Sequence, residues 1–472
     1  MIELMVDLQG GAKAPLYEKI YEYIKNEIVD GKISHGEKLP STRLLAKHLS
    51  VSRSTVELAY DQLLAEGYIE SVPCSGFFAC DIKDLYQIGK EKNTQNPIYA
   101  KQQEKKEESC IDFSPYAIDT AHFPYNVWRK TYKNVLLDDR EELLLPGDGQ
   151  GDYGLRSVIA GYLHQARGVN CEASQIVIGA GNEYLEILLT QMLGPGKRVL
   201  MDDPTYLQAY HTFCNAGYDV VTIPVNENGM SIQQIKESRP DIIYTMPSHQ
   251  FPLGNVMTLK KRLELLKWAS EENGYLIEDD HDSEYRYRGK PIPSLQSIDH
   301  DGRVIYLGTF SKSIAPSIRI SYMVLPQNLL SVYQEKCGFY STTVPKIQQE
   351  VLREFIQEGY FGRHLNKMRA IYKTKHDFLT AELKKCSWVK TVRGDNAGLH
   401  VLVEADSVAK EEAVCACALS LGVKVTGIGE HYIHRPENMK NPILLLGYGK
   451  LTEDEMKMGL QILGDVIQKC SG

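Results

Sequence analysis

Apolar residues near the start of the chain recur with the spacing of an amphipathic helix. Leucine and isoleucine stand at every fourth position from Leu16 to Ile28, which predicts a helix with one buried face that ends at Gly31. Two further amphipathic runs follow, and Ser41 and Ser52 stand directly before them. A serine in that place accepts a hydrogen bond from the first free amides of a helix. The pattern therefore predicts three short helices in succession.

The pattern then changes to two short apolar segments separated by a turn. The segments after Gly67 and after Gly76 have the composition of strands, and Pro73 begins the turn between them. Three helices and a two-stranded wing make a winged helix-turn-helix domain over residues 1–80. Residues 81–110 have mixed charge and few large apolar side chains, which is the composition of a linker.

From residue 111 onward, short apolar runs alternate with longer helical patterns. This alternation predicts an α/β domain with a mostly parallel sheet, extending over residues 111–472. From about residue 346 the helices and two further strand candidates predict a small C-terminal α/β subdomain. The predicted fold class is therefore α/β, preceded by the winged helix-turn-helix.

Composition excludes several classes of protein. A chain of 472 residues that is 43% hydrophobic and 24% charged is long enough for several globular domains. No apolar run approaches the roughly 20 residues of a membrane span, so we expect a cytoplasmic protein without a membrane partner. The ten cysteines include no Cys-x-x-Cys pair, which argues against a zinc site and a disulfide framework, and we expect no bound metal.

The candidate DNA contacts lie at the starts of the second and third helices and in the wing. Hydroxyl side chains and free amides at a helix start can bind phosphates, and an arginine can reach the edge of a guanine. The first 80 residues hold eight Lys or Arg against eleven Asp or Glu, a net charge of −3, so DNA binding requires a small focused surface. The candidates are Ser41, Arg43, Ser52, Arg53, Thr55 and Gly76.

Three strings in this domain resemble the GntR family of bacterial DNA-binding domains. They are Leu39-Pro-Ser-Thr-Arg-Leu-Leu-Ala46, Leu49-Ser-Val-Ser-Arg-Ser-Thr-Val56 and Leu63-Leu-Ala-Glu-Gly-Tyr68. The resemblance implies binding to a double-stranded DNA operator. The wing departs from the family's Arg-Pro-Gly-Ser-Gly-Thr, because this chain has Val72-Pro-Cys-Ser-Gly-Phe77 and lacks the arginine that would enter the minor groove.

One lysine stands where a predicted strand gives way to a loop. An apolar run ends at Gly308, and Lys312 follows four positions later. An amine in such a loop can condense with an aldehyde, and Thr309, Ser311 and Arg319 offer the donors that a phosphate needs. The pattern predicts a pocket for pyridoxal 5′-phosphate, with an ordinary surface lysine as the alternative.

Two other segments would complete this pocket. An apolar run from Tyr275 delivers Asp279 to the end of a predicted strand. A carboxylate there can pair with a pyridine nitrogen, which keeps the nitrogen protonated and makes the ring an electron sink. Gly181 and Asn182 follow another strand and begin a helix, where backbone amides can bind a phosphate.

The spacing of these motifs resembles that of fold type I aminotransferases as carried by MocR/GabR-type transcription regulators. Glu278-Asp279-Asp280, Lys312 and Arg319 carry the resemblance, which extends from about Pro15 to about Gly449. It implies that Tyr206 stacks on the cofactor ring. It also implies a head-to-tail homodimer that senses a small amino compound by aldimine exchange at Lys312.

Three positions depart from the aminotransferase pattern. Phe251 replaces the asparagine that bonds the cofactor's phenolic oxygen, and His281 replaces a tyrosine on the same side of the cofactor. Leu445 stands where aminotransferases have the arginine that binds the substrate carboxylate, and leucine cannot do so. Arg435, in the preceding loop, is the candidate substitute, with a simple surface charge as the alternative.

The favoured hypothesis is a bacterial, pyridoxal-phosphate-dependent transcription regulator whose large domain responds to an amino compound. A working aminotransferase with an appended DNA-binding domain is the alternative, since Lys312, Asp279 and Arg319 suffice for the chemistry. In the favoured hypothesis any transaminase activity is residual. A repressor whose large domain serves only for dimerisation is a third hypothesis, which would leave these three residues without a role.

Overall fold

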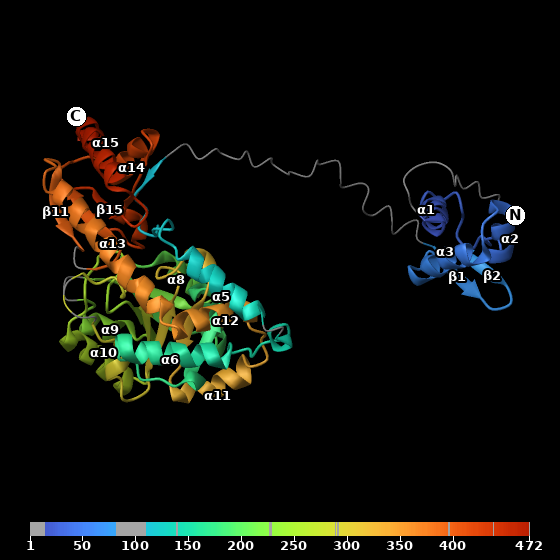
Figure 1. The fold of residues 1–472 in the computed structure, drawn as a ribbon, viewed down its shortest axis with the longest axis horizontal. Helices are drawn as coiled ribbons and strands as arrows, with labels where there is room; N and C mark the ends of the chain where they lie inside the picture. The colour runs from blue at the N-terminus through green and yellow to red at the C-terminus, as the bar shows by residue number, and fades with distance from the viewer. Residues whose placement is uncertain are drawn as a thin grey trace. The chain divides into compact units, whose positions relative to one another are not determined.

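The computed structural model describes residues 15–81, 110–137, 140–225, 229–287, 289, 292–394, 397–437 and 439–471. The chain divides into two compact units, residues 1–106 and residues 107–472 (Figure 1). Each unit is described by itself. In the described residues, no helix is both long and apolar enough to cross a membrane.

The first unit contains three helices and a hairpin, as the apolar pattern predicted. The helices are α1 (Leu16–Val29), α2 (Thr42–Leu49) and α3 (Arg53–Ala65), and the strands are β1 (Ile69–Val72) and β2 (Gly76–Ala79). The two strands pair antiparallel, from Ile69 opposite Ala79 to Val72 opposite Gly76. Apolar residues of α1 and α3 pack together in a common core. The winged helix-turn-helix is therefore confirmed.

A mixed sheet of seven strands forms the centre of the second unit, in the order β4-β10-β9-β8-β7-β5-β6. β10 pairs antiparallel with both β4 and β9, and the other neighbouring strands of this sheet pair in parallel. The largely parallel α/β sheet expected from the sequence is thus confirmed. The strands are β4 (Ile176–Gly179), β5 (Arg198–Asp203), β6 (Asp219–Pro224), β7 (Ile242–Thr245), β8 (Tyr275–Asp280), β9 (Val304–Thr309) and β10 (Ser321–Val324).

Helices bury both faces of this sheet, which explains why its strands are apolar almost throughout. On one face Ile277 of β8 packs with residues of α7, α8 and α11, and on the other face Leu276 packs with residues of α10. Helices α6 and α12 lie side by side and cover another part of the sheet (Figure 1). The helices of this layer are α5 (Tyr125–Leu137), α6 (Tyr153–Arg167), α7 (Asn182–Leu193), α8 (Leu207–Asn215), α9 (Ile232–Ser238), α10 (Leu259–Glu271), α11 (Gln327–Lys336) and α12 (Lys346–Gln357).

A smaller α/β layer follows toward the C-terminus. Its antiparallel sheet has the order β11-β12-β15-β14, and a separate two-stranded sheet pairs β13 with β3 near the start of the unit. The long helix α13 and the last helix α15 share an apolar core with this layer. The elements are β3 (Ile111–Asp112), α13 (Tyr360–Leu383), β11 (Val389–Arg393), β12 (His400–Ala405), α14 (Glu411–Ser420), β13 (Val423–Lys424), β14 (Thr426–Gly427), β15 (Ile443–Gly447) and α15 (Glu453–Ser471).

Three consecutive carboxyl groups are buried at the end of β8, and two of them serve to hold the fold. Glu278 is fully buried and accepts hydrogen bonds from the backbone amides of Leu295 and Gln296, at 2.7 and 2.9 Å. Asp280 forms an ion pair with Arg167, whose Nε lies 2.7 Å from a carboxylate oxygen, and both side chains are almost completely buried. These contacts join the end of β8 to the segment at Leu295 and to the end of α6.

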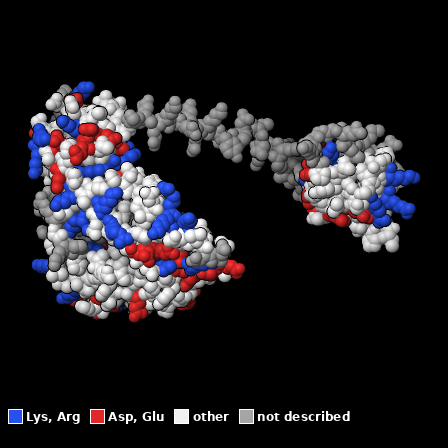
Figure 2. All heavy atoms as spheres, in the orientation of Figure 1, with Lys and Arg blue, Asp and Glu red and all other residues white. Residues whose placement is uncertain are grey.

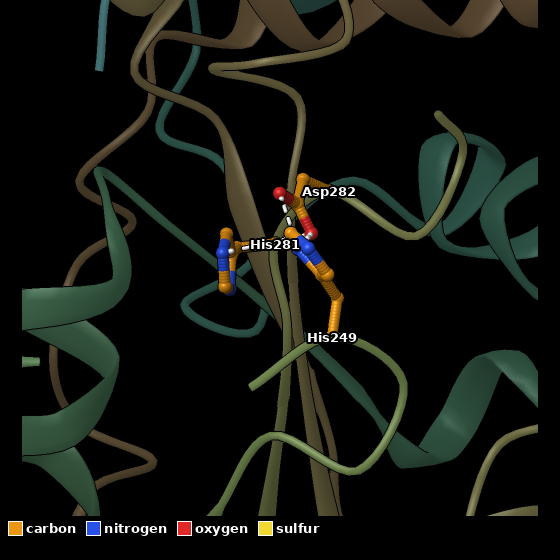
Figure 3. A group of neighbouring side chains, drawn as sticks. All are labelled: His249, His281 and Asp282. Carbon is orange, nitrogen blue, oxygen red and sulfur yellow. Dashed lines mark hydrogen bonds and ion pairs between the residues drawn. The ribbon is translucent and has the colours of Figure 1, made fainter. Parts of the chain in front are cut away.

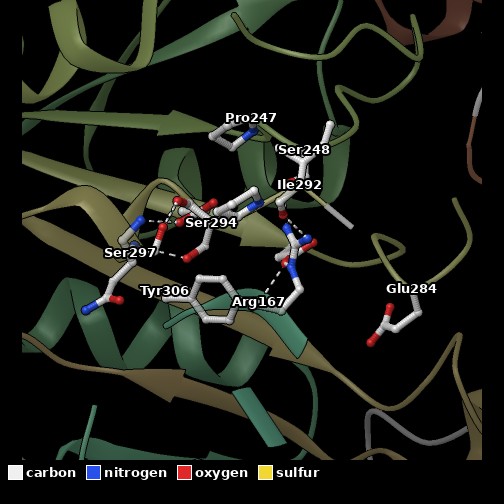
Figure 4. A network of polar contacts seen from close by, with 12 residues as sticks. Arg167, Pro247, Ser248, Glu284, Ile292, Ser294, Ser297 and Tyr306 are labelled. Atoms are coloured by element: carbon white, nitrogen blue, oxygen red, sulfur yellow. Dashed lines mark hydrogen bonds and ion pairs between the residues drawn. The ribbon is translucent and has the colours of Figure 1, made fainter. Parts of the chain in front are cut away.

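Arg167 has further partners that complete its buried network (Figure 4). Its guanidinium donates to the Ser248 hydroxyl at 2.5 Å and to the backbone oxygen of Ile292. The hydroxyl of Tyr306, on β9, donates to Asp280 at 2.5 Å. Five separate segments of the chain are thereby joined at the end of the sheet.

We expect Arg167→Ala to lower the free energy of unfolding of the second unit by about 3–5 kcal/mol, because it leaves Asp280 buried without its cation. Arg198→Ala removes an ion pair with Asp219 in which both side chains are substantially exposed, and should change it by about 1 kcal/mol or less. All three tryptophans lie in the second unit, so tryptophan fluorescence during urea unfolding measures the difference. Equal effects of the two substitutions would contradict this account of Arg167.

Candidate functional site

One cavity lies where the ends of β8 and β9 approach the start of α7. Its lining brings together segments that are far apart in the sequence. Every residue that the sequence assigned to a cofactor lines it, except Gly181. The lining residues are Tyr116, Asn182, Glu183, Tyr206, Phe251, Asp279, His281, Thr309, Ser311, Lys312, Arg319 and Ser321.

One side of the cavity is suited to an anion. The Thr309 hydroxyl donates to Ser311 Oγ at 3.1 Å, and the Ser321 hydroxyl donates to Thr309 Oγ1 at 2.9 Å. The Arg319 guanidinium lies over Gly181, the residue before α7, and a Cβ there would be only 2.0 Å from Arg319 Nη2. Any residue larger than glycine would clash with Arg319 here, which explains why glycine precedes α7 at the predicted phosphate-binding turn.

Lys312 lies in the turn that follows β9, as the sequence predicted. Its Nζ is 6.0 Å from the centre of the Phe251 ring. The hydroxyl of the buried Tyr285 donates to the backbone oxygen of Lys312 at 3.1 Å, which ties the turn to the segment after β8. The backbone at Lys312 is therefore fixed by a hydrogen bond, while the side chain of Lys312 lines the cavity.

Asp279 is the acid at the end of β8 that faces the cavity. It accepts hydrogen bonds from Asn182 Nδ2 at 3.3 Å and from the hydroxyl of Tyr244. Burial raises its pKa to about 7, even though the Tyr244 hydrogen bond and the charge of Lys312 act in the opposite direction. A cationic group that entered the cavity beside Asp279 would relieve this burial cost, which is the chemistry that a protonated pyridine nitrogen offers.

His281 stands beside Asp279 with its pKa lowered to about 4, chiefly by burial. It is therefore neutral near pH 7. The next residue, Asp282, has both carboxylate oxygens 3.0 Å from Nδ1 of His249 (Figure 3). Burial alone would raise the pKa of Asp282, but the neighbouring His249 holds it well below its usual range.

These three side chains are close enough to share a metal ion, but a buried His-Asp hydrogen bond already accounts for their arrangement. The short contacts join His249 to Asp282, whereas His281 Nε2 is 3.6 Å from the nearer oxygen of Asp282. The sequence did not reveal His249 as the partner of Asp282, because 33 positions separate them.

The structure explains two of the departures from the aminotransferase pattern. Phe251 is 2% exposed and packs edge-on against Tyr206 and His431, so it forms an aromatic wall rather than a hydrogen-bonding one. Leu445 is fully buried in β15, where it pairs with Leu402 of β12. Leu445 belongs to the core and does not line the cavity.

Arg435 has carboxylate partners in the structure. The sequence offered it as a substitute for the missing arginine, but the structure gives it other partners and it does not line the cavity. Its guanidinium bonds to Glu412 and lies 3.6 Å from Glu411, both in the first turn of α14. Arg435 lies in a loop and the two acids begin α14, so the sequence did not indicate that these side chains would pair.

Sequence reasoning missed three residues of the cavity. Tyr116 lies before the first long helix of the unit, in a segment without a motif. Ser321 begins β10, two positions after Arg319, and adds a hydroxyl to the anion-binding side. Glu183 follows Asn182 directly and places a carboxylate 2.8 Å from Arg319. Only the position of Glu183 beside the predicted cradle could have drawn attention to it.

In the first unit, the candidate DNA contacts lie at the helix starts as predicted. Ser41 caps α2 by accepting from the amide of Leu44 at 3.2 Å, and Ser52 caps α3 by accepting from the amide of Thr55 at 3.1 Å. Arg43 is exposed in the first turn of α2.

Basic and acidic side chains are separated on the face of the first unit that Figure 2 draws, so a basic surface exists there although the net charge is negative. Figure 2 shows its Lys and Arg gathered mainly toward one side and its Asp and Glu mainly elsewhere. Arg53 is exposed at the start of α3 and pairs with Glu57 of the same helix at 2.7 Å. At the wing, a Cβ on Gly76 would be 3.3 Å from the side chain of Lys38, a basic residue that the sequence analysis did not select.

Family models match both units. The model for bacterial regulatory proteins of the gntR family matches residues 16–79. The model for aminotransferase class I and II matches residues 108–440.

Relatives share this combination over their whole length. The uncharacterized HTH-type transcriptional regulator YdeL of Bacillus subtilis is 42% identical over 95% of this chain and 96% of its own. The probable rhizopine catabolism regulatory protein MocR of Rhizobium meliloti is 30% identical over 97% of this chain and 95% of its own. The chain belongs to the MocR/GabR-type transcriptional regulators. The GntR domain makes the first unit of this MocR-type regulator a DNA-binding module.

Solved structures similar to the second unit are aminotransferases. An archaeal alanine:glyoxylate aminotransferase is 25% identical, with a TM-score of 0.70 over 78% of this chain and 93% of its own. A multiple substrate aminotransferase from Thermococcus profundus is 25% identical, with a TM-score of 0.69 over 77% of this chain and 92% of its own. The class I and II aminotransferase family is dependent on pyridoxal phosphate, and the MocR-type regulator has this fold.

For the cofactor-free MocR-type regulator, we expect Asp279→Asn to increase stability by an amount that depends on pH. Because the folded pKa of about 7 lies above the ordinary value of 3.8, the folded protein retains a proton that the unfolded chain releases. The contribution of Asp279 to stability therefore falls as the pH rises from about 4 to about 7. The gain from Asp279→Asn should grow across this range to about 2–4 kcal/mol.

Urea unfolding of both proteins at pH 5 and pH 8 measures this gain. Asp301→Asn, at an exposed site, is the matched control and should show no such trend. A difference between Asp279→Asn and the wild type that stays constant with pH would contradict the raised pKa.

Proposed function

We propose that this chain is a bacterial regulator that binds an operator through its first unit and holds pyridoxal 5′-phosphate in the cavity of its second unit, with a small amino compound as effector. The observation that carries the proposal is that Lys312, Asp279 and Arg319 line one cavity in a chain with a GntR domain. Such a protein acts in the cytoplasm, where its operator is.

The side chains of the cavity correspond to the parts of the cofactor. When bound, the cofactor supplies a reactive aldehyde and an electron-withdrawing ring. The neutral imidazole of His281 can exchange a hydrogen bond with the phenolic oxygen without adding a charge. We assign Lys312 to the aldehyde carbon, Asp279 to the ring nitrogen, Tyr206 to the ring face, His281 to the phenolic oxygen, and Thr309, Ser311, Arg319, Gly181 and Asn182 to the phosphate.

Lys312 is the residue through which an effector would act. An amino compound would compete with its amine for the same aldehyde, and the displaced amine would lie beside the Phe251 ring, whose centre is 6.0 Å from Nζ. A ligand shifts a two-state protein only by its different affinity for the two states, typically about 1–3 kcal/mol. Competition for one covalent partner is a sufficient source of that difference.

Two contacts count against efficient transamination. Leu445 is buried in the core, and Arg435 is engaged by Glu411 and Glu412. In the described residues that line the cavity, the only lysine or arginine side chains are Lys312 and Arg319, which we assign to the cofactor. A carboxylate clamp of the ordinary aminotransferase kind is thus missing from this chain's own lining, which favours a sensor over a catalyst.

A homodimer is part of the proposal. Leucines 136 and 137 at the end of α5 and leucines 144 and 145 after it are each more than half exposed. A cluster of exposed apolar side chains on a globular unit is typical of an interface. A second copy of the chain is the partner that the family's head-to-tail arrangement implies.

We expect Lys312→Ala to bind its operator but to lose the response to the effector. Wild-type protein with pyridoxal phosphate should show a visible absorption band that borohydride removes, and one compound from a panel of amines should change both this band and DNA binding. Lys312→Arg, which keeps the charge but not the reactive amine, is the matched control and should fail in the same way.

A Lys312→Ala protein that responds to the amine like the wild type would overturn the sensing mechanism. Steady conversion of the amine to a carbonyl product, with keto acids as acceptors, would instead favour the aminotransferase alternative.

We expect Arg53→Ala to weaken binding to an operator selected with the wild-type protein by about tenfold or more, because an arginine–guanine contact contributes about 1–3 kcal/mol. The control is Lys32→Ala, at an exposed lysine after α1 that bonds to Glu27. Fluorescence anisotropy with labelled DNA measures both. If Arg53→Ala binds as tightly as Lys32→Ala, Arg53 is not a base contact.

A further inference from the structure

The anion-binding side of the cavity contains an acid of its own. Oε2 of Glu183 lies 2.8 Å from Nη2 of Arg319, and the two side chains remain 43% and 51% exposed. Arg319 also donates to the backbone oxygen of Ala180 at 3.2 Å. The guanidinium that we assign to the cofactor's phosphate is therefore already bonded to a carboxylate of the same chain.

Glu183 is held at this place by the start of helix α7. It lies in the first turn, where the free amides and the helix dipole stabilise a negative charge. Gly181, directly before the helix, allows Arg319 to cross over it, and a Cβ on Gly181 would be 2.7 Å from the Glu183 carboxylate as well as 2.0 Å from Arg319. The ion pair thus lies directly over the predicted phosphate cradle.

A phosphate bound at this cradle meets Glu183 in two ways. It must take Arg319 from the carboxylate, and it then carries its own negative charge beside that of Glu183. Because both side chains are about half exposed, the ion pair is weak enough for an incoming phosphate to replace. It still opposes binding, since two anions compete for one guanidinium.

We infer that Glu183 competes with the cofactor's phosphate for Arg319 and thereby sets how tightly pyridoxal phosphate is held. This inference rests on the proposed function, because it requires that the cavity binds this cofactor. Glu183 would thus disfavour the phosphate, whereas the other residues that we assign to the phosphate favour it. The aldehyde and ring ends of the site, at Lys312 and Asp279, are unaffected by this competition.

The test compares two ligands that differ only in the phosphate. The dissociation constants of pyridoxal phosphate and of pyridoxal are measured on the full-length, cofactor-free protein by visible absorbance. Glu183→Gln keeps the size of the side chain and removes its charge, and should bind pyridoxal phosphate about fivefold more tightly. Its affinity for pyridoxal should stay within about twofold of the wild type.

Two further variants make the comparison specific. Glu183→Ala also removes the charge and should give the same selective gain, which provides a second measurement if one variant folds poorly. Glu271→Gln removes an acid that pairs with Lys267 on the surface of α10, and should change neither constant.

The inference is overturned if Glu183→Gln and Glu183→Ala leave the affinity for pyridoxal phosphate unchanged or weaken it, or if they tighten both ligands equally. Failure of the proposed function has a different signature, because the wild type would then develop no new absorption band when pyridoxal phosphate is added.

Discussion

A run of buried carboxyl groups at the end of β8 is the constraint around which the second unit is arranged. A buried acid must be hydrogen-bonded, paired with a cation or kept protonated. Asp280 is paired with Arg167, Glu278 accepts two backbone amides, and Asp282 bonds to His249. Each of these contacts connects a segment distant in sequence to the same edge of the sheet.

Asp279 differs from these acids, because it lines the cavity and is not paired with a cation among the described residues. Its bonds come from two uncharged side chains, and its pKa stays near 7. Burial makes the charged form of Asp279 unfavourable when the cavity is empty, and a cation bound beside it would stabilise that charge. The neighbouring strand β9 ends on the same side of the sheet and leads to Lys312, so the carboxyl group of Asp279 and the amine of Lys312 line the same cavity.

The rest of the cavity distinguishes this chain from a general aminotransferase. Phe251 closes one wall with an aromatic ring, Leu445 is committed to the core, and Arg435 is committed to two glutamates. In our proposal the substrate end lacks the usual cation, and the cofactor end holds an acid, Glu183, that would oppose the phosphate. Both changes suit a protein that reports on occupancy rather than one that turns over substrate rapidly.

The sequence by itself determined the order of elements, the winged helix, and the positions of Lys312, Asp279, Thr309 and Ser311. It could do so because apolar periodicity marks strand ends, and residues at the same ends of parallel strands must meet. The tertiary structure alone decided that Arg167 pairs with Asp280, that Arg435 turns to α14, and that Glu183 reaches Arg319. The partners in these pairs lie 113, 24 and 136 positions apart. Local pattern carries no information about which side chain will be nearest once the sheet is assembled.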